Sequence, residues 1–365
     1  MREGWTYKKF EDCLVKAPKA KQVQTSQYNT GTKYPIVSQE DALISGYFDD
    51  DAYLYHINNP IVVFGDHTRV LKYIDFDFVV GADGVKILIP KEFLNAKLLY
   101  YYLLWYKIPN LGYSRHYKLL KEIDIPIPPL SEQQSIVAEL DKINELISLK
   151  KAQLSDLDSL AQSIFYDMFG DPIENEKGWE VKKLGEVTEP TIGLTYKPDN
   201  VTSDGTGTIV LRSSNIQDSK LDFEDVVRVN MLIKDNKYVK DGDILMCSRN
   251  GSFRLVGKVA MIHALSERMS YGAFMTIIRS EYNPYLFGYF KTSAFREYLI
   301  QGKTTTVNQI TVQMLKEIKL PLPPLPLQQE FAKRIELIEQ QKTQISSTIK
   351  DLETLLASRM QYWFD

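Results

Sequence analysis

The chain contains one sequence frame twice. Residues 125–130, Ile-Pro-Ile-Pro-Pro-Leu, recur at 320–325 as Leu-Pro-Leu-Pro-Pro-Leu, an offset of 195, and Gln-Gln follows each copy after two intervening residues. Gly-Trp followed by paired lysines also occurs twice, at 4–9 and at 178–183, an offset of 174. Because the two offsets differ, segments of unequal length lie between the constant elements. The pattern predicts two divergent modules, each followed by one constant element, as in a protein that recognises two different targets at a fixed separation.

A long helical pattern follows each proline segment. From Ser131 to Met168 there is no glycine or proline, and apolar residues recur at the a and d positions of a heptad, with Lys150 as a polar exception. The second copy has the same phase, interrupted by Lys342 and Arg359. A helix of about 38 residues is roughly 57 Å long, so we predict two spacer helices that form a coiled coil. The expected seam residues are Ile136, Leu140, Ile143, Ile147, Leu154, Leu157, Ala161, Ile164 and Met168, then Phe331, Ile335, Ile338, Ile345, Ile349, Leu352, Leu356 and Trp363.

The start of each helix carries its own signal. Ser131 and Gln134 have the spacing of a capping box, and Pro326 suits the first turn of the second helix. The prolines keep residues 125–129 extended, which predicts a stiff joint between module and helix. Two unrelated amphipathic core helices are the alternative, but these would not be expected to match in length, heptad phase and prolines.

The two variable modules, residues 5–124 and 179–319, have the pattern of mixed α/β domains. Short β-rich runs alternate with Gly, Asp and Asn turn signals, and helical stretches are expected at 95–106 and 284–299. The expected strands cover residues 34–37, 60–64, 85–89, 208–211, 243–247 and 273–279.

Polar side chains follow the predicted strands at corresponding places in both modules. Arg, Asn, Gln, Ser and Thr are the residue types that contact base edges and phosphates. Each loop alone would be interpreted as a solvated turn. The indication of a binding role is that such loops recur at matching places in both modules. The candidate DNA-binding residues are Ser38, Gln39, His67, Thr68, Arg69, Ser114, Arg115 and His116 in the first module, and Arg212, Ser213, Asn215, Arg249, Asn250, Ser252, Arg254, Lys303, Thr304, Asn308 and Gln309 in the second.

Composition sets limits on the class of protein. A chain of 365 residues is long enough for two or three domains. The net charge of −3 is unusual for a nucleic-acid binder, but affinity for phosphates depends on local basic surface. Cys13 and Cys247 lack metal-ligand spacing and predict buried thiols in a reducing compartment. The longest apolar run, 98–106, is too short to span a bilayer, and the N-terminus lacks a signal-peptide pattern, so we expect a cytoplasmic protein.

Motifs for catalysis are nearly absent. Asn283-Pro284-Tyr285 lacks the second proline of an amino-methyltransferase motif, and no Gly-rich cofactor loop precedes it. None of the four histidines has metal-ligand spacing, so no metal site is expected. No catalytic residue is therefore predicted in this chain.

The organisation resembles the specificity subunit of a Type I restriction–modification enzyme. The residues that carry the resemblance are the Gly-Trp openings with paired lysines, the doubled proline motif with Gln-Gln, and the two long helices, which together cover essentially the whole chain. The resemblance implies an α/β fold of two globular target-recognition domains separated by two long helices packed as an antiparallel coiled coil, with a pseudo-two-fold internal repeat. The implied division is target-recognition domain 1 at 1–124, proline joint and spacer helix 1 at 125–170, target-recognition domain 2 at 171–319, and proline joint and spacer helix 2 at 320–365.

The resemblance also implies partners. Each module would recognise one half of a split site in double-stranded DNA, while the helices set the spacing and dock methyltransferase (M) subunits, expected to be two. Restriction (R) subunits would join through the complex. S-adenosylmethionine is expected in the M subunit, and this chain is expected to hold neither a cofactor nor an active site.

Apolar residues outside the heptad seam are the candidates for binding the M subunits through a four-helix arrangement. Two rival hypotheses remain, a fragment of a DNA methyltransferase or nuclease with its own activity, and a coiled-coil scaffold that does not bind DNA specifically. The candidate partner-binding residues are Val137, Leu146, Leu160, Phe165, Leu337 and Leu355.

Overall fold

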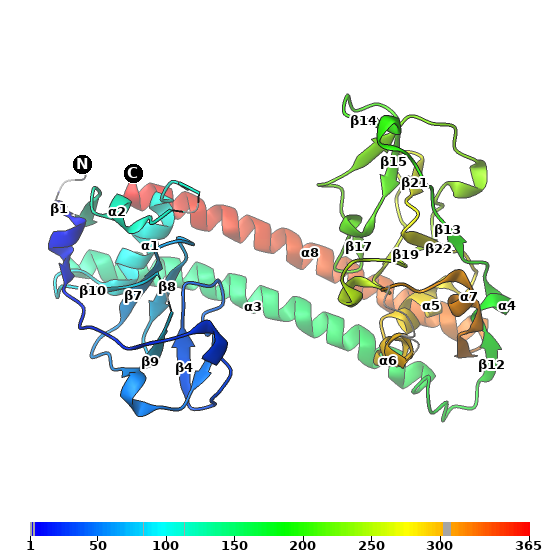
Figure 1. The fold of residues 1–365 in the computed structure, drawn as a ribbon, viewed down its shortest axis with the longest axis horizontal. Helices are drawn as coiled ribbons and strands as arrows, with labels where there is room; N and C mark the ends of the chain where they lie inside the picture. Colours follow the sequence, from blue (N-terminus) through cyan, green and yellow to red (C-terminus); the bar gives the residue numbers. More distant parts are fainter. Residues whose placement is uncertain (1, 3, 83, 113, 302–307) are drawn as a thin grey trace. The chain divides into compact units, whose positions relative to one another are not determined.

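The computed structural model describes residues 2, 4–82, 84–112, 114–301 and 308–365. The chain divides into two compact units, one formed by Met1–Ala152 with Ser346–Asp365 and the other by Gln153–Ile345. Each unit contains one module together with parts of both long helices, α3 (Leu130–Phe169) and α8 (Leu325–Phe364) (Figure 1).

The first module contains one four-stranded and one five-stranded sheet. One is the antiparallel sheet β2-β10-β7-β8, and the other is β3-β9-β4-β5, in which β9 runs parallel to β3 and β4 and also pairs with β6. The strands are β1 (Thr6–Lys9), β2 (Leu14–Val15), β3 (Gln22–Val23), β4 (Tyr34–Val37), β5 (Gly46–Phe48), β6 (Leu54–Tyr55), β7 (Ile61–Gly65), β8 (Leu71–Ile74), β9 (Phe78–Gly81), β10 (Val85–Pro90) and β11 (Asp124–Ile127). The helices are α1 (Ala96–Tyr106) and α2 (Tyr117–Leu120), with short 3-10 turns η1 (Phe10–Cys13), η2 (Thr25–Gln27) and η3 (Asp51–Tyr53).

The second module repeats this plan. Its sheet β13-β22-β19-β20 corresponds to β2-β10-β7-β8, and the parallel pair β15/β21 corresponds to β4/β9. The strands are β12 (Glu180–Lys183), β13 (Thr191–Ile192), β14 (Val201–Thr202), β15 (Thr208–Leu211), β16 (Ile216–Gln217), β17 (Lys220–Leu221), β18 (Val227–Val229), β19 (Ile244–Cys247), β20 (Val259–Met261), β21 (Met269–Tyr271), β22 (Met275–Ile278) and β23 (Lys319–Leu322). The helices are α4 (Leu184–Val187), α5 (Asn283–Phe290), α6 (Ser293–Gln301) and α7 (Val312–Glu317), with 3-10 turns η4 (Pro198–Asn200), η5 (Ser213–Asn215), η6 (Asp235–Lys237) and η7 (Phe253–Leu255).

The two repeated sequence elements of each module pair with one another. Strand β1, after the Gly-Trp opening, is antiparallel to β11, the proline segment, with Lys9 opposite Asp124. Strand β12 pairs in the same way with β23, with Lys183 opposite Lys319. The prolines are therefore extended, as predicted, and each proline segment is also part of a two-stranded ladder that closes its module.

The two long helices run antiparallel, as predicted. In the first unit the start of α3 lies beside the end of α8, where Glu139 accepts hydrogen bonds from Arg359 and Trp363. In the second unit the end of α3 lies beside the start of α8, where Phe165 and Phe331 pack edge to face at 5.8 Å. Fully burying an aliphatic seam side chain contributes roughly 1.5–3 kcal/mol. Within each unit, the most buried seam residues are Ile136, Leu140, Ile143, Ile147 and Ile349, then Leu157, Met168, Phe331, Ile338 and Ile345.

The predicted charged interruptions in α8 are paired across the seam. Lys342 is only 8% exposed and its Nζ lies 2.6 Å from Asp158 Oδ1 and 3.2 Å from Glu339 Oε1. Arg359 pairs with Glu139, and both of these residues lie in the first unit. A buried charge is tolerated in a coiled coil when a partner of opposite charge lies across the seam.

Two local predictions were wrong. Helix α3 begins at Leu130, so Ser131 lies inside the first turn, and the carbonyl of Pro129 accepts from the backbone N–H of Glu132 and Gln133 instead. The predicted helical stretch at 284–299 is two helices, α5 and α6. Thr292 starts the second one, since its Oγ1 accepts from the backbone N–H of Phe295 at 3.3 Å.

Both cysteines are buried and form no disulfide. Burial raises the pKa of the Cys13 thiol to about 11 and also raises the pKa of Cys247, so both are protonated near neutral pH. Among the described residues no helix is long and apolar enough to cross a membrane.

Candidate nucleic-acid interface

The polar loops predicted from the sequence meet in each module. We name the first set loop cluster 1 and the second set loop cluster 2. Each consists of a loop after a strand of the mixed sheet, a loop after a central strand of the antiparallel sheet, and the segment just before a short helix. Loop cluster 1 is residues 38–39, 66–69 and 114–116, and loop cluster 2 is residues 212–215, 248–254 and 308–309.

Loop cluster 1 is held together by hydrogen bonds between its three segments. Thr68 Oγ1 donates to the carbonyl of Gln39 at 2.6 Å, and the backbone N–H of His67 donates to Gln39 Oε1 at 3.3 Å. The backbone N–H of His116 donates to the carbonyl of Asp66 at 2.8 Å. The segments are therefore fixed relative to one another although they are far apart in the sequence.

Two buried charged residues that the sequence did not single out support loop cluster 1. Asp66 is 2% exposed and accepts from the backbone N–H of Tyr117 at 2.7 Å. Lys72 is 4% exposed, and its Nζ donates to the carbonyls of Ser38 at 2.8 Å and Ala42 at 2.5 Å. Burial lowers the pKa of Lys72 because the ammonium loses solvation. A lysine at the centre of β8 has no distinguishing pattern, since its burial depends on how the loop folds over it.

Loop cluster 2 has the same kind of cross-connection. Asn250 donates from its backbone N–H to the carbonyl of Asn308 at 3.2 Å and from Nδ2 to Ser213 Oγ at 3.1 Å. Arg249 and Gln309 form an antiparallel β-bridge. The loop 248–254 therefore contacts both other segments of loop cluster 2, just as the loop 66–69 contacts both other segments of loop cluster 1.

The main-chain frame is equivalent in the two clusters. In loop cluster 1, the carbonyl of Asp66, directly after β7, accepts from the backbone N–H of His116, directly before α2. In the second, the residue after β19 accepts from the segment before α7, where the carbonyl of Ser248 accepts from the backbone N–H of Ile310 at 2.8 Å. The frame is repeated, while the side chains that it carries differ.

The predicted residues differ in what they offer to a ligand. Thr68, Arg115, Arg249, Ser252 and Arg254 are exposed. A second group is partly exposed, comprising Gln39, His67, Arg69, Ser114, Arg212, Ser213, Asn250, Asn308 and Gln309.

Some predicted DNA-binding residues have an internal role in this structure. Ser38, His116 and Asn215 are at most 2% exposed. The His116 ring lies 3.0 Å from the carbonyl of Asp66, and Asn215 Nδ2 donates to the carbonyls of Asp222 and Asp225. This corrects the expectation that these three side chains are on the surface, since they shape the loops from within.

Two predicted arginines have partners inside the protein. Arg212 Nη2 is 2.7 Å from Asp225 Oδ2, and Arg69 Nη1 donates to the carbonyl of Ile108 at 3.1 Å. Arg69 has a φ of 64°, which turns the chain sharply after β7. Lys303 and Thr304 lie outside the described residues.

The candidate partner-binding residues fall into two groups. Leu146, Leu160, Leu337 and Leu355 are between 37% and 61% exposed, and Val137 is partly buried against the first module. Phe165 was predicted to face outward, and this is wrong, because it is 1% exposed in the core of the second unit.

The surroundings of Phe165 give the reason for the error. It stacks on Tyr285 of α5 with ring centroids 5.5 Å apart, so this face of α3 packs on the second module. Met360 stands 195 residues later in α8 and is buried against the first module in the same way. Each helix therefore buries a second apolar face against a module.

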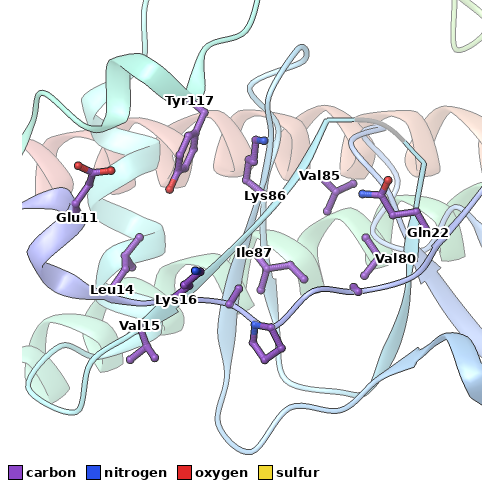
Figure 2. A pocket seen from close by; sticks show the side chains of 13 residues that line it. Glu11, Leu14, Val15, Lys16, Gln22, Val80, Val85, Lys86, Ile87 and Tyr117 are labelled. Carbon is purple, nitrogen blue, oxygen red and sulfur yellow. The ribbon is translucent and has the colours of Figure 1, made fainter.

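A pocket of about 440 Å3 opens in the first module between the segment 14–22 and strand β10 (Figure 2). Its wall contains Val80 and Ile87, and Lys86 lies toward Tyr117, with Nζ 5.6 Å from the ring centroid. Within the residues that the structure describes, no group of three or more His, Cys, Asp or Glu is placed to hold a metal ion.

Comparison with known proteins places the chain in a family. The family model described as "Type I restriction modification DNA specificity domain" matches residues 2–158 and 176–354. The chain belongs to this family. Each match covers one module and most of the long helix that follows it, so the family unit is the repeat seen in the sequence.

Individual members of the family are distant relatives. The Escherichia coli strain K12 "Type I restriction enzyme EcoKI specificity subunit" is 27% identical over 188 residues, 49% of this chain and 40% of the relative. The Salmonella potsdam "StySPI specificity subunit" is 29% identical over 187 residues, 49% of this chain and 39% of the relative. These alignments span about two fifths of each relative's length.

Solved structures share the fold over the full chain. A chain from a structure of the type I R-M system covers 100% of this chain and 98% of its own length, with a TM-score of 0.58 and 17% identity. The type I restriction-modification S subunit from M. genitalium covers 99% and 96%, with a TM-score of 0.56 and 15% identity. The two-module architecture with two long antiparallel helices is thus the fold of this family.

Proposed function

We propose that this chain is the DNA-recognition subunit of a type I restriction–modification complex and that each loop cluster contacts one half of a bipartite DNA site. The observation that carries the proposal is the repetition of one main-chain frame, in loop clusters 1 and 2, with different side chains on it. Sequence-specific recognition requires different donors and acceptors for different bases, held on a rigid support. A repeated frame with divergent side chains meets this requirement twice.

The exposed side chains of the clusters have suitable chemistry. Arg115, Arg249 and Arg254 are exposed, next to hydroxyl and amide groups that donate and accept hydrogen bonds. This makes the clusters locally basic, although the whole chain has a net charge of −3.

The helices supply the second half of the proposal. Leu146, Leu160, Leu337 and Leu355 would dock the M subunits, expected to be two, and the R subunits would join through that complex. S-adenosylmethionine and the chemistry of methyl transfer would belong to the M subunit. This chain would contribute recognition and spacing without catalysis.

Exchange of one module tests the proposal. Residues 179–319 are replaced with the corresponding module of another member of the family, and the preferred sites of the assembled complex are selected from a randomised duplex library. The expected result is a change in one half of the site only. A change in both halves, or no sequence preference in either protein, would overturn it.

The two rival hypotheses make different predictions. If the chain is a fragment of a methyltransferase, the purified chain alone will transfer labelled methyl groups from S-adenosylmethionine to DNA. If it is a scaffold, its complexes will bind duplex DNA without sequence preference. We expect no transfer without the M subunit, and a preferred site in its presence.

A further inference from the structure

We infer that Arg249 and Phe274 form one base-recognition unit in the second module, in which Phe274 holds the guanidinium and Arg249 contacts a guanine. The inference rests on the proposed function and assigns a part of it to one pair of side chains. Phe274 did not stand out in the sequence, because only the folded structure brings it to loop cluster 2.

The contact between the two residues is made by main chain and side chain together. Phe274 lies in the turn between β21 and β22, and its carbonyl accepts from the backbone N–H of Ser248 at 2.9 Å and of Arg249 at 3.1 Å. The guanidinium carbon of Arg249 lies 5.2 Å from the centroid of the Phe274 ring. A cation over an aromatic face is attracted by the negative charge of that face.

Phe274 is an exposed aromatic residue at loop cluster 2. The residue is 57% exposed although it is large and apolar. An exposed aromatic ring beside a charged donor, within a cluster of polar loops, is a common feature of binding surfaces. Phe274 therefore has a surface on which a base pair can pack, for instance through the methyl group of thymine.

Arg249 is positioned but not neutralised. Its backbone is fixed by the bridge to Gln309 and by the hydrogen bonds that Asn250 makes on either side. Among the ion pairs of the described residues Arg249 takes part in none, whereas Arg212 is paired with Asp225. Its donors are thus available to a ligand, while those of Arg212 are partly occupied.

The same position in the first module carries different residues. There the carbonyl of Gly84 accepts from the backbone N–H of Asp66 at 2.7 Å, so Gly84 corresponds to Phe274 and His67 to Arg249. A Cβ built on Gly84 would lie 2.6 Å from Gln39 Oε1, and Gly84 has a φ of 81°. A phenylalanine cannot replace it without moving Gln39. A position with a constant frame and exchanged side chains is where specificity would be expected to reside.

The choice of guanine as the contacted base follows from the hydrogen-bonding groups of arginine. The planar guanidinium presents parallel N–H donors that match O6 and N7 of guanine in the major groove. The contact with the Phe274 ring restricts the rotation of the Arg249 side chain before DNA arrives, and the guanidinium N–H donors take part in no ion pair of the described residues. Such a bidentate contact discriminates between base pairs by roughly 5- to 150-fold in affinity.

The test uses the full chain in complex with the M subunits and selection from a randomised duplex library. In the Arg249→Ala variant we expect loss of the G·C preference at one position of the second half-site, by roughly 5- to 150-fold. Arg249→Lys keeps the charge but should lose most of this preference, since lysine lacks the fork. Phe274→Leu keeps an apolar side chain and should weaken the preference at the same position only.

A matched arginine–aromatic pair outside loop cluster 2 provides the control. The guanidinium carbon of Arg268 lies 3.8 Å from the centroid of the Tyr238 ring, and Arg268 also pairs with Asp235 at 2.8 Å. Arg268→Ala should leave the preferred site unchanged. Thermal unfolding of every variant checks that each is folded.

The outcomes separate the inference from the proposed function. If Arg249→Ala lowers affinity equally for all sequences and lowers the salt dependence by about one ion, Arg249 contacts phosphate and the inference is overturned. An unaltered preference in Arg249→Ala or Phe274→Leu overturns it as well. If the wild-type complex itself has no preferred site, the proposed function fails instead.

Discussion

Gln133 and Gln328, 195 positions apart, make the same hydrogen bond. Gln133 Nε2 donates to the carbonyl of Pro128 at 2.8 Å, and Gln328 Nε2 donates to the carbonyl of Pro323 at 2.6 Å. Both glutamines are buried at the junction of the proline segment and the long helix. Pro128 and Pro323 also correspond in the repeat, so the glutamine amide fixes the joint in both halves of the molecule.

The two joints differ in how many bonds the glutamine makes. Gln133 also donates to the carbonyl of Phe93 at 2.9 Å and accepts from the backbone N–H of Asn95 at 2.8 Å, whereas Gln328 Oε1 has no hydrogen-bond partner among the described residues. Because a buried group left unpaired costs about 1–3 kcal/mol, we expect Gln133→Ala to destabilise its unit by about 2–3 kcal/mol and Gln328→Ala by about 1 kcal/mol. Chemical denaturation of the two variants, each the other's control, measures the difference. Equal losses would contradict this assignment.

A second prediction concerns pH and the contact of Glu139 with Arg359. The hydrogen bond from the Arg359 guanidinium lowers the pKa of Glu139. A carboxylate with a lowered pKa in the folded state contributes stability above its unfolded pKa, and this stability is lost as the pH falls through the folded value. The Glu139 side chain is 33% exposed, so solvent screening limits the effect to about 0.5–1 kcal/mol.

Thermal unfolding between pH 7 and pH 3 checks this prediction. Wild-type protein should lose more stability on acidification than Glu139→Gln, and the two curves should converge at the acid end. Glu353→Gln is the control, because Glu353 pairs with Lys151 on the same two helices but is 51% exposed. Parallel curves for wild type and Glu139→Gln would show that the pair does not stabilise the fold.

The third prediction concerns the outer faces of the helices. Leu146 is 37% exposed and Leu160 47% exposed, on α3. Placing a charge in an apolar interface leaves it desolvated and unpaired, so the double change of Leu146 and Leu160 to Glu should abolish co-purification with the M subunit. Leu232→Glu, at a side chain 97% exposed in a loop, should not. Retained assembly of the double variant would mean that the M subunit docks elsewhere.

The fourth prediction treats the helices as a spacer of defined length. One heptad inserted after Lys150 and another after Ile345 keep the seam in phase and add about 10 Å to each helix. We expect the unspecified gap between half-sites to lengthen by up to roughly 3 base pairs, with unchanged half-site sequences. Those base pairs rotate one half-site by roughly 100°, so some affinity is lost. Site selection on the insertion variant is the measurement, and an unchanged gap would exclude a spacer role.

The sequence was most informative where a pattern repeats. The doubled proline motif and the heptads predicted the joints, the two long helices and the two modules, and residues 208–211 form β15 as predicted. That the helices run antiparallel was implied by the family resemblance. These features depend on local periodicity and proline stereochemistry, which the sequence carries directly.

The errors arose where tertiary contact decides. Phe165 lies outside the heptad seam, and the pattern could not show that this face of α3 packs on Tyr285. The break between α5 and α6 has no glycine or proline, and Thr292 provides the cap. Phe274 lies beside Arg249 only in the folded protein, since exposure and proximity are properties of the fold.

The ladders β1/β11 and β12/β23 have a consequence for how such chains can vary. Each fastens the two ends of an insert side by side, at the spacing of paired strands. The long helix that follows each module therefore starts next to the first strand of that module, whatever the length of the insert between the two strands of the ladder. Inserts of different length can therefore be closed by the same two-stranded ladder. The unequal offsets of 174 and 195 show that the two inserts of this chain do differ in length.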